Sequence, residues 1–137
     1  MAFTRLTRDL PCILATLREA AGPGVPIVAL NYYNLLVAAW LLGPAGQAAA
    51  RASADLVDAF NARLEGLYAA NRVPVGDVAR AFHADDFRLV PALDLPVNVV
   101  LVCQVTWMCA PSPQGPNIHA NTSGYFVIAL ALLAALD

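Results

Sequence analysis

The sequence predicts a layered α/β fold, in which helices alternate along the chain with short parallel strands. Segments with apolar residues at helical spacing alternate along the chain with short, continuous apolar runs, which are typical of buried parallel strands. With 137 residues the chain has room for one domain with a modest core, so residues 1–137 are expected to form a single domain. No internal repeat divides it.

The first helix is expected to begin at Asp9, a good N-cap residue, with Pro11 in the first turn, where its missing N–H costs little. Gly22 and Pro23 are expected to end this helix. Between these limits apolar residues recur at helical spacing: Leu10, Ile13, Leu14, Leu17 and Ala21. Residues 25–30, VPIVAL, predict a first buried strand, because their proline is confined to its start.

Three segments follow the first strand. Residues 31–34 predict a polar, aromatic loop, and residues 35–42 a short apolar helix closed by the Gly-Pro pair at 43–44. A long helix is expected over about residues 45–70, with Asn71 at its end. Its inner stripe is expected to hold Leu56, Phe60, Leu64 and Leu67. Its outer side is expected to hold Arg51, Asp55, Asp58 and Glu65.

The second half of the chain alternates in the same way. Residues 73–78, VPVGDV, predict a second parallel strand, and residues 79–82 a short helix that leads into an irregular acidic segment, 83–94. Residues 97–105 are apolar and β-branched, and periodicity alone does not separate strand from helix there. The last helix is expected to start near residues 122–123. Its packing residues are expected to be Phe126, Ile128, Ala129, Leu132 and Leu133.

The composition excludes some function classes. The chain is 59% hydrophobic and 13% charged, with no lysine and a net charge of -2, so it has no basic field for a nucleic-acid backbone. Residues 22–50 and 95–136 are poor in charge, but prolines and polar residues interrupt both, and the longest clean apolar run, 125–136, is too short to span a membrane. The N-terminal residues show no signal-peptide pattern.

The most informative motif is residues 115–129, GPNIHANTSGYFVIA, in which a lone histidine, His119, lies in a polar loop before a Gly-Tyr pair and an apolar helix. The motif TWMCAP, residues 106–111, stands just upstream. Together they resemble the last conserved block of the SGNH, or GDSL-type, serine esterases and lipases. The preceding order of helices and strands is similar to the C-terminal half of that family's domain.

This resemblance implies a partial three-layer α/β/α flavodoxin-like SGNH-hydrolase fold with a short parallel sheet. It also implies the activity of a carboxylic-ester hydrolase, which acts on a small ester substrate and needs no metal or organic cofactor. Members of the family are often secreted.

The resemblance assigns His119 as the general base, a role that needs a partner on the second ring nitrogen to fix the tautomer. In the family an aspartate three residues before the histidine supplies this partner, but here that position is Pro116. Asn117 lies two residues before the histidine, and its side-chain oxygen can accept the imidazole N–H without a full charge. The alternative is a loop histidine with only a structural hydrogen bond.

The nucleophile of the family is not recognisable. Its serine, glycine and asparagine blocks belong to an N-terminal half for which this chain has no counterpart, and no GDS-like turn occurs. None of the three serines stands on a strand-to-helix elbow that would expose it: Ser53, Ser112 and Ser123.

Aromatic and amide side chains near the expected site are candidates for substrate binding. Asn31 follows the first strand, and parallel sheets bind ligands at the carboxyl ends of their strands, although a simple turn residue is the alternative. Tyr32, Tyr33 and Trp107 are candidates to flank an acyl pocket, with ordinary core packing as the alternative. The resemblance also implies a disulfide between Cys103 and Cys109, against two buried thiols; Cys12 is then left over and is expected to be buried.

Two other functions stay open. His83, Asp85 and Asp86, with Asp77, offer nitrogen and oxygen ligands for a metal-dependent hydrolase, although a solvated acidic loop also explains them. A catalytically inactive SGNH-derived fragment or assembly module is the second alternative. If the chain is the C-terminal half of an SGNH domain, apolar faces and a strand edge made for the other half would be left uncovered, so we expect a homo-oligomer or a complementing chain.

Overall fold

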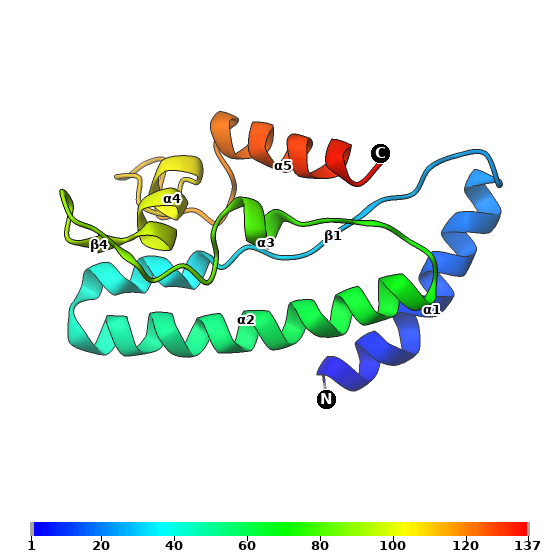
Figure 1. Cartoon of the computed structure of the whole chain (residues 1–137), viewed down its shortest axis with the longest axis horizontal. Coiled ribbons are helices and arrows are strands. Elements are labelled where there is room, and N and C mark those ends of the chain that lie inside the picture. The colour runs from blue at the N-terminus through cyan, green and yellow to red at the C-terminus, as the bar shows by residue number, and fades with distance from the viewer. Residues whose placement is uncertain (1, 137) are drawn as a thin grey trace.

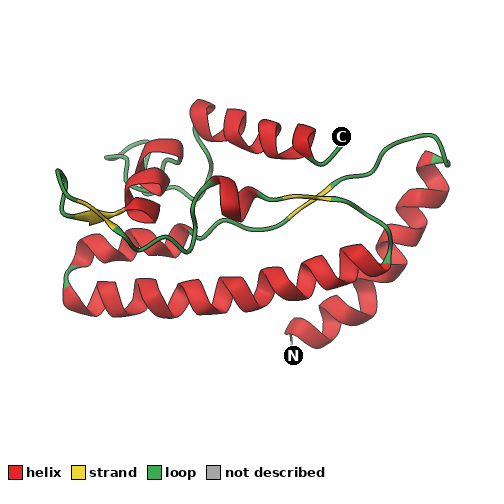
Figure 2. Cartoon of the chain, viewed as in Figure 1, coloured by secondary structure: helices red, strands yellow, loops and turns green. Residues whose placement is uncertain are grey.

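The computed structural model describes residues 2–136 and shows a helix-rich, mixed fold (Figure 1). The helices of this part of the chain are α1 (Ala2–Ala21), the 3-10 helix η1 (Leu35–Leu42), α2 (Pro44–Ala70), α3 (Val78–Ala81), α4 (Val97–Val105) and α5 (Thr122–Ala134). Its strands are β1 (Ala29–Leu30), β2 (Val75–Gly76), β3 (Leu89–Val90) and β4 (Leu95–Pro96). Figure 2 shows how small the share of strand is.

The two-stranded parallel sheet predicted from the apolar runs is confirmed. Ala29 pairs with Val75 and Leu30 with Gly76, while α2 lies below the strands and α5 above them in Figure 1. Both strands are shorter than expected, with two residues each, and β2 begins directly after Pro74, which has no N–H to donate to a neighbouring strand. Gly76 permits the close approach of α5: a Cβ added there would lie 2.9 Å from the carbonyl oxygen of Ala131.

The first helix begins earlier than predicted. It starts at Ala2, Pro11 lies inside it, and Asp9 is not a cap but pairs with Arg8, with Nε 2.6 Å from Oδ1. The less exposed side of α1 carries Leu6, Leu10 and Leu14, and this i, i+4 stripe continues through the proline. The helix ends where expected, before Gly22, whose φ of +78° is a conformation that glycine adopts without strain.

Small residues, rather than the predicted large ones, form the buried side of α2. Leu64 is buried as expected, but Leu56 is 59% exposed. The side chains that face the interior are Gly46, Ala50, Ser53, Ala54, Asn61 and Leu64. The reason is η1, which packs along the first half of α2 so closely that a Cβ on Gly46 would overlap the Ala39 carbonyl oxygen.

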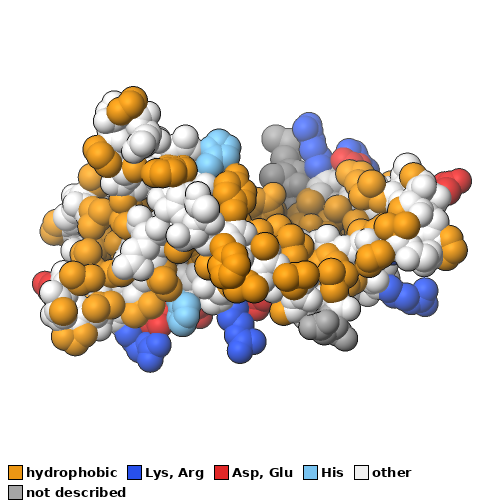
Figure 3. All heavy atoms as spheres, turned by 90° about the horizontal axis from the view of Figure 1, so that it is seen from above, with side chains coloured by type: hydrophobic (Ala, Val, Ile, Leu, Met, Phe, Trp, Pro, Cys, Tyr) orange, Lys and Arg blue, Asp and Glu red, His pale blue; other side chains and the backbone are white. Residues whose placement is uncertain are grey.

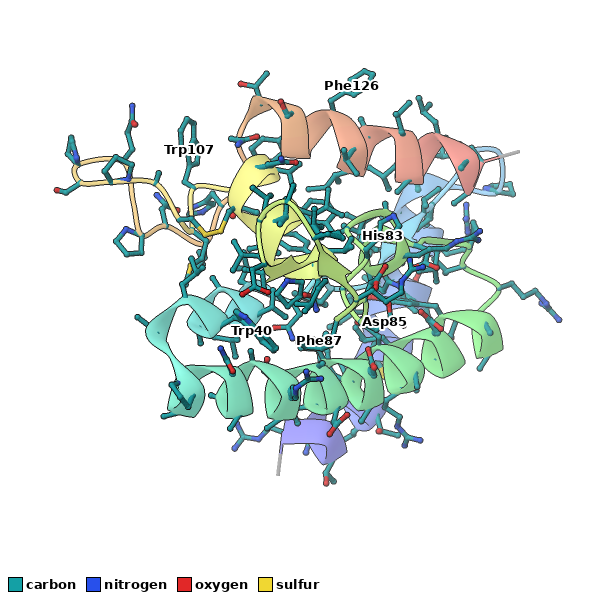
Figure 4. All side chains as sticks on the ribbon, turned by 60° about the vertical axis from the view of Figure 1, so that its left-hand side comes forward. Trp40, His83, Asp85, Phe87, Trp107 and Phe126 are labelled. Carbon is teal, nitrogen blue, oxygen red and sulfur yellow. A yellow bond between two sulfur atoms is a disulfide. The ribbon has the colours of Figure 1, made fainter. Side chains whose placement is uncertain are left out.

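The acidic segment is more ordered than predicted. Its residues 89–90 form β3, which pairs with β4, just beyond the segment, in an antiparallel hairpin with Leu89 opposite Pro96. The undecided residues 97–105 form a helix, α4, because Val99 and Val102 pack against Val37 of η1 to make a fully buried cluster. Trp40 of η1 and Phe87 point toward each other beside it, with ring centroids 5.8 Å apart (Figure 4).

The last helix begins at the predicted residues but has a different inner face. Asn121, the residue before the predicted start, is the N-cap, and its side-chain oxygen accepts the N–H of Gly124 at 3.0 Å. Phe126 and Leu133 are exposed, contrary to expectation, because α5 turns its small and β-branched residues to the sheet. Cys12 is also exposed, so the prediction that it is buried was wrong. Among residues 2–136, no helix has both the length and the apolar character needed to cross a membrane.

Candidate active site

The loop that carries His119 is fastened to the segment that follows α4. Thr106 and Ala120 form an isolated antiparallel bridge. The backbone N–H of Trp107 donates to the His119 carbonyl at 3.0 Å, and the Trp107 carbonyl accepts the N–H of Asn117 at 3.1 Å. One residue, Trp107, therefore holds both ends of the tripeptide 117–119 through its backbone.

A second set of contacts fixes the point where this loop enters α5. The N–H of Asn121 donates to the Val105 carbonyl at 3.0 Å, and its side-chain amide donates to the Gln104 carbonyl at 2.7 Å. The same side chain caps α5 with its oxygen. Asn121 thus joins the end of α4 to the start of α5, a role that sequence reasoning missed although asparagine is one of the preferred N-cap residues.

Asn117 orients the imidazole of His119. Its Oδ1 lies 2.5 Å from Nδ1 and also accepts the backbone N–H of His119 at 3.0 Å. Because the backbone N–H can only donate, the atom that it meets must be the amide oxygen. This oxygen then requires the Nδ1–H tautomer, so Nε2 carries the free lone pair. Within the described residues, Nε2 has no hydrogen-bond partner, and the side chain is exposed.

A disulfide joins Cys103 of α4 to Cys109, with Cα atoms 5.0 Å apart. It closes the turn that contains Trp107, whose backbone holds the histidine loop. The bond is the one that the SGNH resemblance implies. The disulfide thus fixes the turn to the last part of α4, and the backbone hydrogen bonds of Trp107 join the histidine loop to that turn.

Of the predicted substrate-binding residues near the sheet, Tyr33 contacts the histidine loop. Its hydroxyl donates to the Ile118 carbonyl at 3.4 Å, and its ring stacks on the buried ring of Phe82, with centroids 4.2 Å apart. Burial raises the pKa of the Tyr33 hydroxyl, and the nearby hydroxyl of Tyr125 raises it further. Tyr33 therefore supports the histidine loop through its hydroxyl, while its ring is stacked on Phe82 and does not line an open pocket there.

Trp107 is partly buried, and its side chain points upward from the loop in Figure 4, on the same side as Phe126. Tyr32 is 58% exposed and meets the edge of Phe60, with centroids 5.4 Å apart. Its backbone is held by Asn61, which accepts its N–H at 2.8 Å and donates to its carbonyl at 2.7 Å. No contact joins Tyr32 to the described atoms of His119.

Asn31 has a structural position at the carboxyl end of β1. It is buried; its amide donates to Asp77 at 2.8 Å and to Glu65 at 3.0 Å, and its oxygen accepts the N–H of Ala79 at 2.9 Å. It therefore ties β1 to α2 and to the start of α3. These three bonds occupy the side chain of Asn31, and none of them reaches the histidine loop.

The serines do not supply a nucleophile next to His119. Ser53 is buried, donates to the Ala50 carbonyl at 2.7 Å and accepts from the amide of Asn34 at 2.9 Å. Ser112 and Ser123 are exposed, and within residues 2–136 neither is hydrogen-bonded to the imidazole. The geometry brings together a base and its orienting partner, but not a serine.

The acidic residues line a separate, open cavity of about 1360 Å³, together with residues of α2, β2 and the end of α5. Arg88 donates to Asp86 from its guanidinium, at 2.6 and 2.9 Å, and from its backbone N–H, and so holds the pKa of that carboxyl well below its usual range. His83 contributes more weakly, with Nδ1 3.6 Å from Asp86. Figure 4 labels His83 and Asp85, which lie near each other. The two histidines of the chain, pale blue in Figure 3, lie at opposite edges of that view, so His83 and the cavity are far from His119.

Of the residues suggested as metal ligands, Asp86 is bound by Arg88, and the others line the cavity at separate positions. Across residues 2–136, no group of three or more histidine, cysteine, aspartate or glutamate side chains could hold a metal ion. Comparison with known proteins adds no relative: the chain matches no family model, no curated protein and no solved structure.

Proposed function

We propose that this chain is a carboxylic-ester hydrolase of the SGNH type, in which His119 is the general base and Asn117 orients it. One observation carries the proposal: Asn117 Oδ1 lies 2.5 Å from Nδ1, while Nε2 is exposed and free to accept a proton. A base for ester cleavage needs this combination of a fixed tautomer and an accessible lone pair.

The reaction follows from the position of Nε2. A hydroxyl group bound to Nε2 loses its proton to the imidazole as its oxygen bonds to the ester carbonyl carbon. The bond from that carbon to the alcohol oxygen then breaks, and the leaving alcohol takes the proton back from Nε2. The hydroxyl belongs to water, and the acid is then released directly, or to a serine of a complementing chain, because Ser53, Ser112 and Ser123 are not placed to supply it. In the serine case the acyl group is transferred to the serine oxygen, and a water molecule, deprotonated by Nε2, then releases the acid while the serine takes the proton back.

The neutral partner sets a limit on this base. In serine proteases, exchange of the orienting aspartate for asparagine lowers kcat by about 10⁴, because the amide can present its N–H and favour the wrong tautomer. Here the backbone N–H of His119 holds the amide oxygen in place, so the tautomer is correct. What is missing is the negative charge that stabilises the imidazolium.

The test is hydrolysis of a short-chain aryl ester by the purified chain, with a serine-directed phosphonate in a parallel reaction. We expect His119→Ala to lose about 10²–10⁴ of the rate, and Asn117→Asp to raise it by at least about tenfold because the carboxylate adds the missing charge. His83→Ala is the matched control and is expected to keep the wild-type rate, since its histidine belongs to the acidic cavity.

A rate that is unchanged in His119→Ala, or equally reduced in His83→Ala, contradicts the proposal. Phosphonate labelling distinguishes a serine nucleophile from water. If the chain has no activity above that of His119→Ala, the alternative of an inactive assembly module is the better description, and the absence of a serine beside His119 is the observation that favours it.

A further inference from the structure

The outer face of α5 is an apolar surface that the described chain leaves uncovered. Its large side chains have between 49% and 65% of their surface exposed: Tyr125, Phe126, Leu130, Leu133 and Leu136. Phe126, Ala129, Leu130 and Leu133 have the i, i+3, i+4, i+7 spacing of a single helical stripe. Phe126 points straight away from the body of the molecule in Figure 4. We call the residues of this stripe, with Tyr125 and Leu136, the α5 face.

The α5 face is apolar and also uncharged. No residue between 95 and 136 is charged, and the inner side of α5, against β2 and α3, is apolar as well. Figure 3 shows apolar side chains across the middle of this view, with charged groups confined to its edges. A helix that is apolar on all sides is normally buried, so a second surface must cover this one.

We propose that the α5 face binds the same face of a second copy of this chain, with the two α5 helices packed about a two-fold axis near Ala129. Ala129 is the small residue at the centre of the stripe, where two helices approach most closely. A two-fold interface brings each side chain against the same patch of the partner, and a neutral patch meets its copy without charge repulsion.

The area of the α5 face suits this partner. With about 200 Å² for each aromatic residue and somewhat less for each leucine, its half-exposed large side chains offer roughly 500 Å². Two such faces bury roughly 1,000 Å², the lower limit for a specific interface, before the small residues between them are counted. The expected product is a dimer that dissociates on dilution.

A lipid surface fits the α5 face less well. Helices that lie in a membrane interface carry lysine or arginine on their polar side, and those charges contribute to binding. The chain has no lysine, and all its arginines precede residue 89. The 13 residues of α5 are also too few to span a bilayer.

The first experiment is sedimentation velocity of the 137-residue chain from about 1 µM to about 200 µM, a range that brackets micromolar dissociation constants. We expect a monomer–dimer equilibrium that Leu133→Glu weakens at least about tenfold, because each copy then places a charge in the apolar contact. Leu42→Glu is the matched control: Leu42 is 80% exposed on η1, away from α5, and its replacement should leave the equilibrium unchanged. Circular dichroism of each variant verifies the helix content.

The second experiment does not depend on a destabilising charge. In a Cys12→Ser background, Ala129→Cys is expected to form a disulfide-linked dimer under mild oxidation, because the two-fold axis places this residue against itself. Ala48→Cys, exposed on α2, is the control and should stay monomeric. This inference is independent of the proposed hydrolase activity.

Three results overturn the proposal. They are a wild-type monomer over the whole concentration range, an equal loss of dimer in Leu42→Glu, and no preferential cross-linking of Ala129→Cys. Flotation with phosphatidylcholine vesicles tests the lipid alternative. Binding to vesicles by a monomeric wild-type chain, abolished by Leu133→Glu, would assign the α5 face to lipid instead.

Discussion

Replacing Gly124 by alanine is expected to separate the start of α5 from the segment that supports the histidine loop. A Cβ built on Gly124 would overlap the carbonyl oxygen of Val105 and lie 2.9 Å from the Cβ of Ala120. Neither neighbour can move alone, because Val105 accepts the N–H of Asn121 and Ala120 is bridged to Thr106. The methyl group therefore pushes two fastened backbone segments apart.

The cost is the sum of three effects. Overpacking of a tight contact destabilises by about 1–3 kcal/mol, and loss of the hydrogen bond from Asn121 to Val105 adds about 1 kcal/mol. Alanine in place of glycine in a helix returns up to about 1 kcal/mol. The net expectation for Gly124→Ala is a loss of about 1–3 kcal/mol in the free energy of unfolding.

Urea denaturation followed by circular dichroism measures this change, and ester hydrolysis shows whether the histidine loop is displaced with it. Gly66→Ala is the matched control, because an added Cβ there meets nothing within 4 Å on the outer side of α2. It should stabilise the chain by about 0.5–1 kcal/mol. The reasoning is refuted if both substitutions change stability with the same sign.

Three further changes probe charge and covalent bonding. Asp58→Asn should stabilise the chain at neutral pH by less than about 1 kcal/mol, because burial first, and neighbouring carboxylates second, raise the pKa of the Asp58 carboxyl; the gain should vanish as the pH falls below about 4, the ordinary pKa of an aspartate. Asp86→Asn should flatten the loss of stability in acid, since the bonds from Arg88 lower the folded pKa of Asp86 and so stabilise the fold above about pH 4. Replacement of both Cys103 and Cys109 by serine should cost about 2 kcal/mol, from the loop that their separation of six residues closes.

Urea titrations at several pH values measure the first two of these changes, and a titration at pH 7 measures the third. A gain for Asp58→Asn that persists below pH 4 contradicts the assigned cause, as does a wild-type acid limb in Asp86→Asn. Stability of the double serine variant equal to that of the wild type would show that backbone hydrogen bonds alone hold the turn.

The sequence predicts those parts of the fold whose signals are local. Periodicity predicts the long helix α2 and the two strands that pair, β1 and β2. Glycine and asparagine predict the C-terminal ends of α1 and α2. The prediction of which side chains are buried fails where a packing element distant in sequence determines which face of a helix is covered. Leu56 satisfies the helical period of α2 but is exposed, because η1 packs against a different side of the helix and accepts only small residues there.

The candidate site divides in the same way. The contact of His119 with Asn117 spans two residues of one loop, and sequence spacing is enough to suggest it. Asn31 and Tyr33 owe their roles to hydrogen bonds with distant residues: Asp77 lies 46 positions after Asn31, and Ile118 lies 85 positions after Tyr33. No local sequence pattern predicts such contacts. The SGNH assignment itself stays a prediction from the motif around His119.

Residues 95–136 carry no charge, whereas charged side chains occur among residues 2–94. These two parts of the chain should therefore differ in how their stability depends on salt and on alcohol. Salt acts on ion pairs, and those found among residues 2–136, such as the pairs of Arg8 and Arg88, lie in the first part. The second part, with α4, the histidine loop and α5, depends on apolar contact, backbone hydrogen bonds and one disulfide. Ionic strength should therefore leave the surroundings of His119 unchanged while it weakens the contact of Arg88 with Asp86 before the hairpin, and low concentrations of alcohol should do the reverse.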